Sequence, residues 1–399
     1  MWFEKGAGIL SNFICQIIIK PMRKPKNLFF DIPNGWMFFS LLSCLAFIAF
    51  YNLQNKHTAT TTRKMQFYSV SDFQSVPKID GHFHYNSSDV RFLKFADSLN
   101  FRIISPNVDA GTSIDKQLEI TTVIKQQFPG KFAFFGTFTV ANFGTSGFGK
   151  ETVERIEQCM KAGASGIKIW KNIGMSLQDN SGKFVMVGHE KFDTVFNYLE
   201  KHQIPLLAHL GEPKNCWLPV DQMTTPNDKR YYQSHPQYHM FLHPESPSYE
   251  DQINARNQLL QKHPGLEFIG AHLASEEWSV EELSKSFDRY PQLKADLAAR
   301  ISHLQYQSSK DREKVRNFLI KYQDRIIYGT DMSVNEKSTN YASVCEGMKR
   351  TWLDHWIYLA TDSTMVFKDM PDTKLEGLHL PKEVIDKIFY KNAERYFKN

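Results

Sequence analysis

Cysteine is scarce in this chain, and the few cysteines follow no pattern. Among 399 residues there are only 5, with no CxxC pair and no regular spacing. These absences argue against a disulfide framework and against a cysteine-based zinc site, although they leave room for a single bridge. A glycine-rich phosphate loop is also missing after the first strand-like run, which argues against an open, doubly wound nucleotide-binding sheet.

A strong charge of one sign is missing as well. The formal net charge is +5, and lysine and arginine are spread along the chain rather than clustered. We therefore expect no nucleic-acid partner. With 42% hydrophobic and 23% charged residues, the composition is that of a globular protein with a buried core. The expected partner is a small-molecule substrate, and a homo-oligomer stays open.

Long hydrophobic runs are absent except for one near the N-terminus. Residues 35–51 are 17 consecutive uncharged residues, and a basic stretch precedes them. This pattern is typical of a signal sequence or, as we prefer here, an uncleaved membrane anchor. The positive-inside rule then predicts a membrane-anchored or exported protein whose catalytic domain lies outside the cytoplasm, on the periplasmic side in a bacterium. The predicted parts are a basic and apolar tail at 1–34, the anchor at 35–51, a polar linker at 52–75 and one domain at 76–399.

Short runs of β-branched or aromatic residues alternate with longer helical stretches through the rest of the chain. The predicted strands are Lys78–His84, Arg102–Val108, Phe132–Val140, Gly166–Trp170, Pro205–His209, Glu267–His272, Leu293–Leu297 and Arg325–Asp331. The predicted helices between them include 113–128, 150–162, 189–202, 249–262, 276–290 and 311–321. Strands that alternate with helices indicate a parallel sheet, and eight such units favour a closed (β/α)₈ barrel of the TIM type.

Two segments are too long for ordinary connections. Residues 211–248 follow the fifth predicted strand and are rich in proline, histidine and aromatic residues. A segment that follows a barrel strand is expected over the active-site mouth, so we interpret it as a lid. His235, His239 and His243 recur at intervals of four within it, but the prolines there favour a plain aromatic and polar lid over a metal site. Residues 341–371 are predicted to form a long helix and a cover.

Histidines and an aspartate fall at the ends of the predicted strands. The first strand ends in His82-Phe-His84, and residues two apart in a strand point to the same side. An HxH pair alone is a weak signal. The others are Lys168 in the fourth strand, His209 and His272 at the ends of the fifth and sixth, and Asp331 at the end of the eighth. Because the carboxyl ends of barrel strands converge on one mouth, these side chains are predicted to meet there and bind a divalent metal.

This constellation resembles the amidohydrolase superfamily. The segments around these residues are similar to its amidohydrolase-related branch, which includes aromatic-acid decarboxylases and lactonases, and the closing segment GLHLPKEVIDKIFYKNAERYF is typical of that branch. The resemblance implies a metal-dependent enzyme over residues 77–399. The implied cofactor is a divalent metal, first of all zinc, with manganese or iron open.

The resemblance implies two possible ligand sets. With two metals, His82, His84 and Asp331 would bind the first, His209 and His272 the second, and a carboxylated Lys168 would bridge them. With one metal, His209 would join the first set, His272 would be a catalytic or orienting side chain, and Lys168 would be a strand lysine. Asp80 is expected to support the ligands rather than bind the metal.

The expected reaction follows from the metal. A bound dication lowers the pKa of its water from 15.7 toward about 7, and Asp331 is the expected general base. The leading function is hydrolysis of a C–O or C–N bond in a lactone, ester or amide. The alternatives are a metal-dependent decarboxylase of a small carboxylic acid, and an inactive, membrane-tethered binding barrel. The expected substrate contacts are Trp170, Glu212, Lys214 and Arg300, with Lys171, Asn172 and Asp296 close to them in the sequence.

Overall fold

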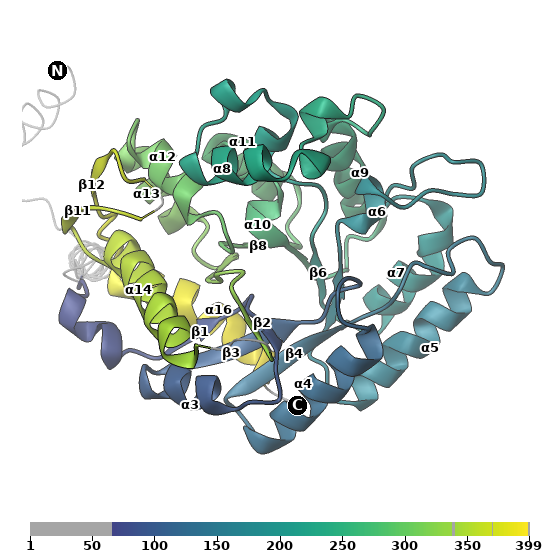
Figure 1. The fold of residues 1–399 in the computed structure, drawn as a ribbon, viewed down its shortest axis with the longest axis horizontal. Helices are drawn as coiled ribbons and strands as arrows, with labels where there is room; N and C mark the ends of the chain where they lie inside the picture. The colour runs from purple at the N-terminus through teal and green to yellow at the C-terminus, as the bar shows by residue number, and fades with distance from the viewer. Residues whose placement is uncertain (1–65, 337–339, 369, 398–399) are drawn as a thin grey trace, which may run out of the picture. The chain divides into compact units, whose positions relative to one another are not determined.

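Eight parallel strands form one curled sheet, with helices packed around it (Figure 1). The computed structural model describes residues 66–336, 340–368 and 370–397. The sheet order is β1-β3-β4-β5-β6-β7-β8-β9. Each of these strands therefore lies beside the strand of this sheet that follows it in the chain. The strands are β1 (Lys78–Asp80), β3 (Phe101–Pro106), β4 (Phe132–Thr137), β5 (Ile167–Ile169), β6 (Leu206–Ala208), β7 (Phe268–Gly270), β8 (Leu293–Asp296) and β9 (Ile326–Ile327).

Each predicted strand is present, but each is shorter than its hydrophobic run. The main helices are α3 (Arg91–Ser98), α4 (Ile114–Gln127), α5 (Phe148–Lys161), α7 (Asp193–Lys201), α9 (Tyr249–Lys262), α11 (Val280–Arg289), α12 (Ile301–Ser308), α13 (Arg312–Lys321) and α14 (Tyr341–Ala360). The shorter ones are α6 (Asn172–Met175), α8 (Pro226–Ser234), α10 (Ala271–Ala274), α15 (Lys382–Asp386) and α16 (Asn392–Glu394).

Several helices start at capping residues. Ser248 precedes α9, its hydroxyl accepts a hydrogen bond from the backbone N–H of Asp251, and its own backbone N–H donates to the Asp251 carboxylate. Ser279 and Asp311 cap α11 and α13 in the same way, each accepting from the N–H three residues on. These side chains satisfy donors that a helix start leaves unpaired, which fixes where each helix begins after its strand.

The two end strands of the sheet, β1 and β9, come together just past their carboxyl ends. The backbone N–H of Gly81 donates to Tyr328 O at 2.8 Å, and that of Asp331 donates to His82 O at 2.7 Å. A Cβ at position 81 would lie 2.7 Å from Ile327 Cγ2 and 2.9 Å from Tyr328 O, so this approach requires glycine. The two short strands β2 (His84–Asn86) and β10 (Ser333–Asn335) then pair in parallel and extend the junction.

Two cores hold the sheet. Residues of the strands that point inward pack with each other and with Ala393 and Tyr396 near the C-terminus, and Tyr396 is 4% exposed. A larger core fills the space between the strands and the surrounding helices. Because the interior of the sheet is filled with side chains, the only place for chemistry is its rim, where the strands end.

The localisation predicted from the N-terminal run is corrected. Within residues 66–336, 340–368 and 370–397, no helix combines the length and the apolar character needed to cross a bilayer. The predicted tail, anchor and most of the linker lie outside the described residues. We therefore withdraw the membrane-anchored or exported assignment and the membrane partner that came with it.

Candidate metal centre

His82, His272 and Asp331 meet where the strands end. One ligand atom from each lies within 4.8 Å of the others. His84 Nε2 lies 3.1 Å from Asp331 Oδ1, and His209 Nδ1 lies 3.3 Å from His272 Nε2. The structure therefore brings all four histidines and the aspartate predicted as metal ligands into one connected group.

The backbone that carries these residues differs from the predicted strands. His82 lies between β1 and β2 rather than within a strand, so the rule that strand residues two apart share a side does not apply to it. His272 lies in a left-handed turn in which residues 272–275 have φ between 55° and 61°, and Asp331 has a φ of 62°. Such conformations cost non-glycine residues roughly 1 kcal/mol or more each and concentrate at functional sites.

Three histidines have the same tautomer, fixed by the group behind each ring. His82 Nδ1 lies 2.7 Å from Asp296 Oδ2, His84 Nδ1 lies 3.1 Å from Pro106 O, and His272 Nδ1 lies 2.9 Å from Ala298 O. A carbonyl or carboxylate oxygen only accepts, so Nδ1–H donates in each case and the Nε2 lone pair is left for the site.

Asp331 therefore faces acceptors. Its Oδ1 lies 3.1 Å from His84 Nε2 and 3.4 Å from His82 Nε2, and in the Nδ1–H tautomer neither ring carries a proton on that nitrogen. Two lone pairs that point at a carboxylate are repulsive unless a cation lies between them. His209 Nε2 is a further buried ring nitrogen without a hydrogen-bond partner among the described residues. The donor set fits a divalent cation.

The protonation states agree with cation binding. Burial lowers the pKa of His82, as Lys168 does too, and Asp296 opposes this. Burial lowers the pKa of His272 to about 3. Burial would raise the pKa of Asp331, but neighbouring positive charge outweighs it and holds that pKa well below its usual range, first of all from the His272 ring in its protonated form. A bound cation supplies that charge when the rings are neutral. Metal ligands must be neutral imidazoles and ionised carboxylates, which are the forms that these shifts favour.

Lys168 lies at the inner side of this group. It belongs to β5, is 1% exposed, and its Nζ lies 3.4 Å from His82 Nε2. Burial lowers its pKa to about 8, so a neutral amine is accessible near physiological pH. A neutral amine is the form that could be carboxylated, and it is also the form that tolerates a nearby cation.

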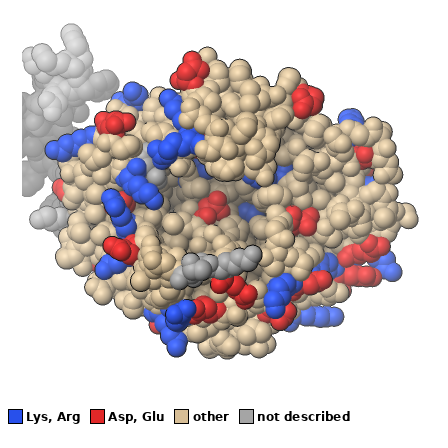
Figure 2. All heavy atoms as spheres, viewed as in Figure 1, with Lys and Arg blue, Asp and Glu red and all other residues tan. Residues whose placement is uncertain are grey.

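The predicted substrate residues divide into two groups. Lys171 and Glu212 form a close ion pair beside Trp170, and Arg300 is 8% exposed with a buried Nε that has no hydrogen-bond partner within the described part of the chain. Lys214 belongs elsewhere, because its Nζ lies over the Trp278 ring, 4.0 Å from the ring centre. Figure 2 shows a hollow in the middle of this face, with acidic and basic side chains inside it.

The lid, residues 211–248, contains one α-helix and four short 3₁₀ helices, which the sequence interpretation did not predict. Helix α8 begins at Pro226 behind Thr225, whose hydroxyl accepts from Asp228 N. Asp228 in turn lies 3.1 Å from His303 Nε2 of α12, and this pair ties the lid to the helix that follows β8. The lid histidines bind backbone carbonyls instead of a metal, with His239 on Leu218 O and His243 on Pro236 O.

Two supporting carboxylates complete the centre. Asp80 accepts from Thr330 N, Thr330 Oγ1 and Trp352 Nε1 at 2.7 to 3.0 Å, so it anchors the last strand and α14 behind the metal ligands. Asp296 holds both His82 and the backbone N–H of His272. Sequence reasoning noted Asp296 at a strand end but assigned it no role. Its place at the end of the seventh strand, level with the ligands on the other strands, was the available signal.

Comparison with known proteins shows the family of the chain. A family model described as "Amidohydrolase" matches residues 130–398. The chain belongs to the amidohydrolase family, a family of metal-dependent enzymes. No curated protein matches the chain.

Several solved structures are similar at low identity. An uncharacterised TIM-barrel protein from Bordetella bronchiseptica has 14% identity, with 80% of this chain and 98% of that chain covered and a TM-score of 0.47. A 2,6-dihydroxybenzoate decarboxylase bound to 2,6-dihydroxybenzoate has 15% identity, 81% and 99% coverage and a TM-score of 0.46. A dihydroxybenzoic acid decarboxylase from Polaromonas sp. JS666, with manganese and 2-nitroresorcinol, has 13% identity, 81% and 97% coverage and a TM-score of 0.46.

Proposed function

We propose that the chain hydrolyses a C–O or C–N bond in a small lactone, ester or amide at this centre. The observation that supports the proposal is the orientation of two rings: Nε2 of His82 and of His84 both lie within 3.4 Å of Asp331 Oδ1, while Nδ1 of each ring lies against an oxygen acceptor. Such a set binds a dication, which supplies a water of lowered pKa and polarises a substrate carbonyl. Zinc is the first candidate, because imidazole nitrogens and a carboxylate suit it.

Asp331 is the proposed proton acceptor. Its side chain is 30% exposed, whereas those of His84 and His82 are 19% and 1% exposed, so a water or substrate reaches Asp331 more readily than these two ligands. Its low pKa keeps it ionised, and an ionised carboxylate takes the proton from the attacking water and returns it to the leaving oxygen or nitrogen. His272 supports this step because its Nε2 lone pair is directed at the same metal centre.

Arg300 and Lys171 orient the substrate in this proposal. Arg300 has a free donor at Nε, and Lys171 stands beside Glu212. The same two cations favour decarboxylation as the second candidate, because a buried guanidinium without an ion pair among the described residues is suited to a substrate carboxylate. In that reaction a bound acid loses carbon dioxide and no water attacks.

Metal content per chain tests the proposal, measured by elemental analysis on the full chain and on Lys168→Ala. About two metals, falling to fewer in the variant, would support a bridged hydrolase centre. One metal in both would remove Lys168 as a ligand and make the two reactions equal candidates. The exposed Lys150→Ala is the matched control, since its side chain is 84% exposed. A chain that takes up no zinc or manganese overturns the proposal.

Reaction type is tested separately on the metal-loaded chain. A panel of neutral lactones, esters and amides is followed by acid release, and a panel of small aromatic acids is followed by carbon dioxide release. Acid release that disappears in Asp331→Asn supports hydrolysis. Carbon dioxide release without acid release would replace hydrolysis with decarboxylation.

A further inference from the structure

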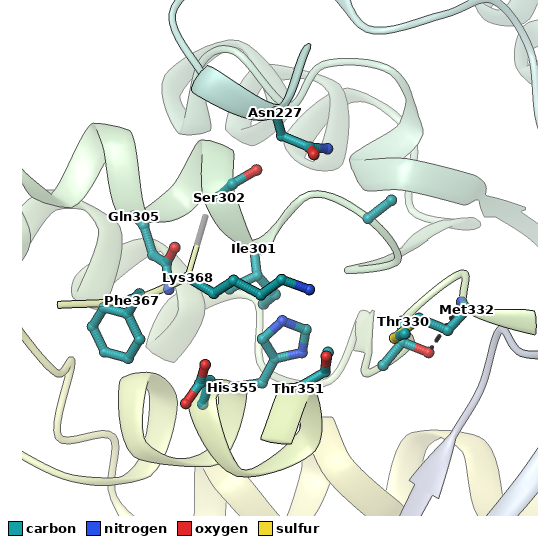
Figure 3. A pocket seen from close by; sticks show the side chains of 12 residues that line it. Asn227, Ile301, Ser302, Gln305, Thr330, Met332, Thr351, His355, Phe367 and Lys368 are labelled. Carbon is teal, nitrogen blue, oxygen red and sulfur yellow. Dashed lines mark hydrogen bonds between the residues drawn. The ribbon is translucent and has the colours of Figure 1, made fainter. Parts of the chain in front are cut away.

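A separate cavity of about 200 Å³ adjoins the metal centre. Its walls come from elements far apart in the sequence: the start of α8, helix α12, helix α14 and the segment after β11 (Thr364–Val366) (Figure 3). Thr330 and Met332, the two neighbours of Asp331, also line it. The cavity therefore shares a wall with the predicted metal ligand while lying to one side of the ligand atoms.

One wall carries an acceptor that the protein leaves unused. Gln305 of α12 is 2% exposed, and its Oε1 is buried without a hydrogen-bond partner among the described residues. An unpaired buried amide oxygen has lost its hydration without gaining a hydrogen bond, and such groups are rare in protein cores. A ligand that donates a hydrogen bond in this cavity would supply that bond.

The lining of the cavity also includes a cation. Lys368 lines the cavity, and Figure 3 shows its side chain extending across the cavity close to the His355 ring. His355 cannot share that charge, because burial and the nearby Lys368 lower its pKa to about 4 and keep it neutral. An ammonium group in this position favours a ligand that accepts, and most of all an anionic oxygen.

We propose that this cavity is a specificity pocket for the distal part of the substrate, and that it takes a short group with both a carboxylate and a hydroxyl. The carboxylate accepts from Lys368, and the hydroxyl donates to Gln305. Because the pocket extends the site of the proposed function, the inference rests on that function.

The cavity is of a size to hold part of a substrate rather than a whole one. Pockets for whole small molecules usually measure about 300–1,000 Å³, and a cavity near 150 Å³ holds a single benzene ring. A volume of about 200 Å³ therefore suits a group of about six to eight heavy atoms. The reacting bond would lie outside the cavity, toward Asp331.

The other polar residues that line the cavity favour a group with both a hydroxyl and a carboxylate over a group with a carboxylate alone. Ser302 and Asn227 offer hydroxyl and amide groups, and Asp354 lines the same cavity as Lys368. A wall with one cation and one carboxylate has no large net charge, so it does not favour a multiply charged ligand such as phosphate. A hydroxy acid satisfies donor and acceptor together.

Binding of three matched probes to the zinc-loaded full chain tests the pocket. The probes are 3-hydroxybutanoate with both groups, butanoate with the carboxylate alone, and butane-1,3-diol with hydroxyls alone; dissociation constants come from calorimetry. We expect 3-hydroxybutanoate to bind about 10-fold more tightly than either partial probe. Lys368→Met should weaken both acids about 10-fold and leave the diol unchanged. Gln305→Leu should weaken 3-hydroxybutanoate and leave butanoate unchanged.

Two controls separate this pocket from the metal centre. Lys150→Met, at an exposed lysine of α5, should change none of the constants. An acid that binds only to the metal would bind Lys368→Met and Gln305→Leu as tightly as the wild type, and that result, or no binding of any probe, overturns the pocket. Metal content is measured in the same samples. If the wild type retains its metal but binds the three probes equally, the pocket alone is contradicted. If the wild type holds no metal, the proposed function is contradicted.

Discussion

His82 Nδ1 and Asp296 Oδ2 lie 2.7 Å apart, and both side chains are 1% exposed. The same carboxylate accepts from the backbone N–H of His272 at 2.7 Å and of Ala298 at 3.1 Å. One side chain at the end of β8 thus fixes the tautomer of a ligand that follows β1 and the left-handed backbone of a ligand after β7. Asp296 is a positioning residue for two ligands at once.

Asp296→Asn should weaken metal binding while leaving the fold intact. The amide has one acceptor where the carboxylate has two, so its NH₂ group must face either His82 Nδ1–H or the backbone donors of His272 and Ala298. Loss of such an outer partner costs about 10- to 100-fold in metal affinity. Zinc dissociation constants from chelator competition measure it. Asp288→Asn, at an aspartate that is 59% exposed, should bind zinc as the wild type does. Equal affinities for all three proteins would contradict the positioning role.

The arrangement of strands and ligands was predictable because two independent periodicities agree on it. Because strands and helices alternate along the chain, the carboxyl ends of all the strands lie at one rim of the sheet, and the predicted ligands fall at those ends. The left-handed turn at residues 272–275 was not predictable, because Leu273 and Ala274 have no local preference for positive φ. It exists because Asp296 holds the backbone N–H of His272 from another strand.

Other differences have equally local or tertiary causes. The run Lys78–His84 reads as one strand, yet hydrogen bonding passes from β1–β3 pairing to β2–β10 pairing at His82, and only the position of the last strand decides that. Helix α8 of the lid could have been predicted, since Thr225-Pro226 is a helix-start signature. The partners of the lid, such as His303 for Asp228, are tertiary and leave no sequence pattern.

Replacing Glu212 alone should lower the free energy of unfolding more than replacing Glu212 and Lys171 together. The two side chains are 8% and 20% exposed, so Glu212→Leu leaves a mostly buried ammonium without its partner. We expect a loss of about 3 kcal/mol in unfolding free energy, at the low end for buried pairs because Lys171 is partly exposed. The double variant with Lys171→Met should recover most of it. Urea unfolding measures all four species.

The exposed pair of Lys116 and Glu119 provides a matched control for this double-mutant cycle. Its side chains are 50% and 64% exposed, and its coupling should stay below about 1 kcal/mol. A coupling between Lys171 and Glu212 as small as this one would mean that water, rather than the partner, stabilises the Lys171 ammonium.

Trp352→Phe should destabilise the protein more than Trp356→Phe. Both tryptophans are fully buried, and both substitutions remove the same atoms. Trp352 Nε1 donates to the carboxylate of Asp80 at 2.9 Å, whereas Trp356 Nε1 donates to the neutral Ser69 O at 3.0 Å. Hydrogen bonds to charged groups contribute about 1.5–3 kcal/mol and neutral ones about 0.5–1.5 kcal/mol. Thermal and urea unfolding give the difference, and a larger loss in Trp356→Phe would contradict this assignment.

His355 should make stability fall as the solution becomes acidic. Its ring is buried against Tyr328, whose hydroxyl lies 2.9 Å from His355 Nδ1, and burial together with Lys368 lowers its pKa to about 4. The unfolded chain binds the proton near pH 6.5, so between pH 6.5 and 4 it holds more protons than the folded chain. Stability from this group is complete above about pH 6.5 and declines toward pH 4, by about 2 kcal/mol from pH 7 to 5.

The His355→Asn variant isolates this contribution, because asparagine keeps a polar group near Nδ1 and does not titrate. It should show a smaller loss of unfolding free energy between pH 7 and 5 than the wild type, by about 2 kcal/mol. His235→Asn is the control, since that ring is exposed and bonds only to Tyr231 O. Its pH dependence should match the wild type. If His355→Asn loses as much stability on acidification as the wild type does, the acid sensitivity arises elsewhere and the Tyr328 hydroxyl keeps His355 protonated in the folded chain.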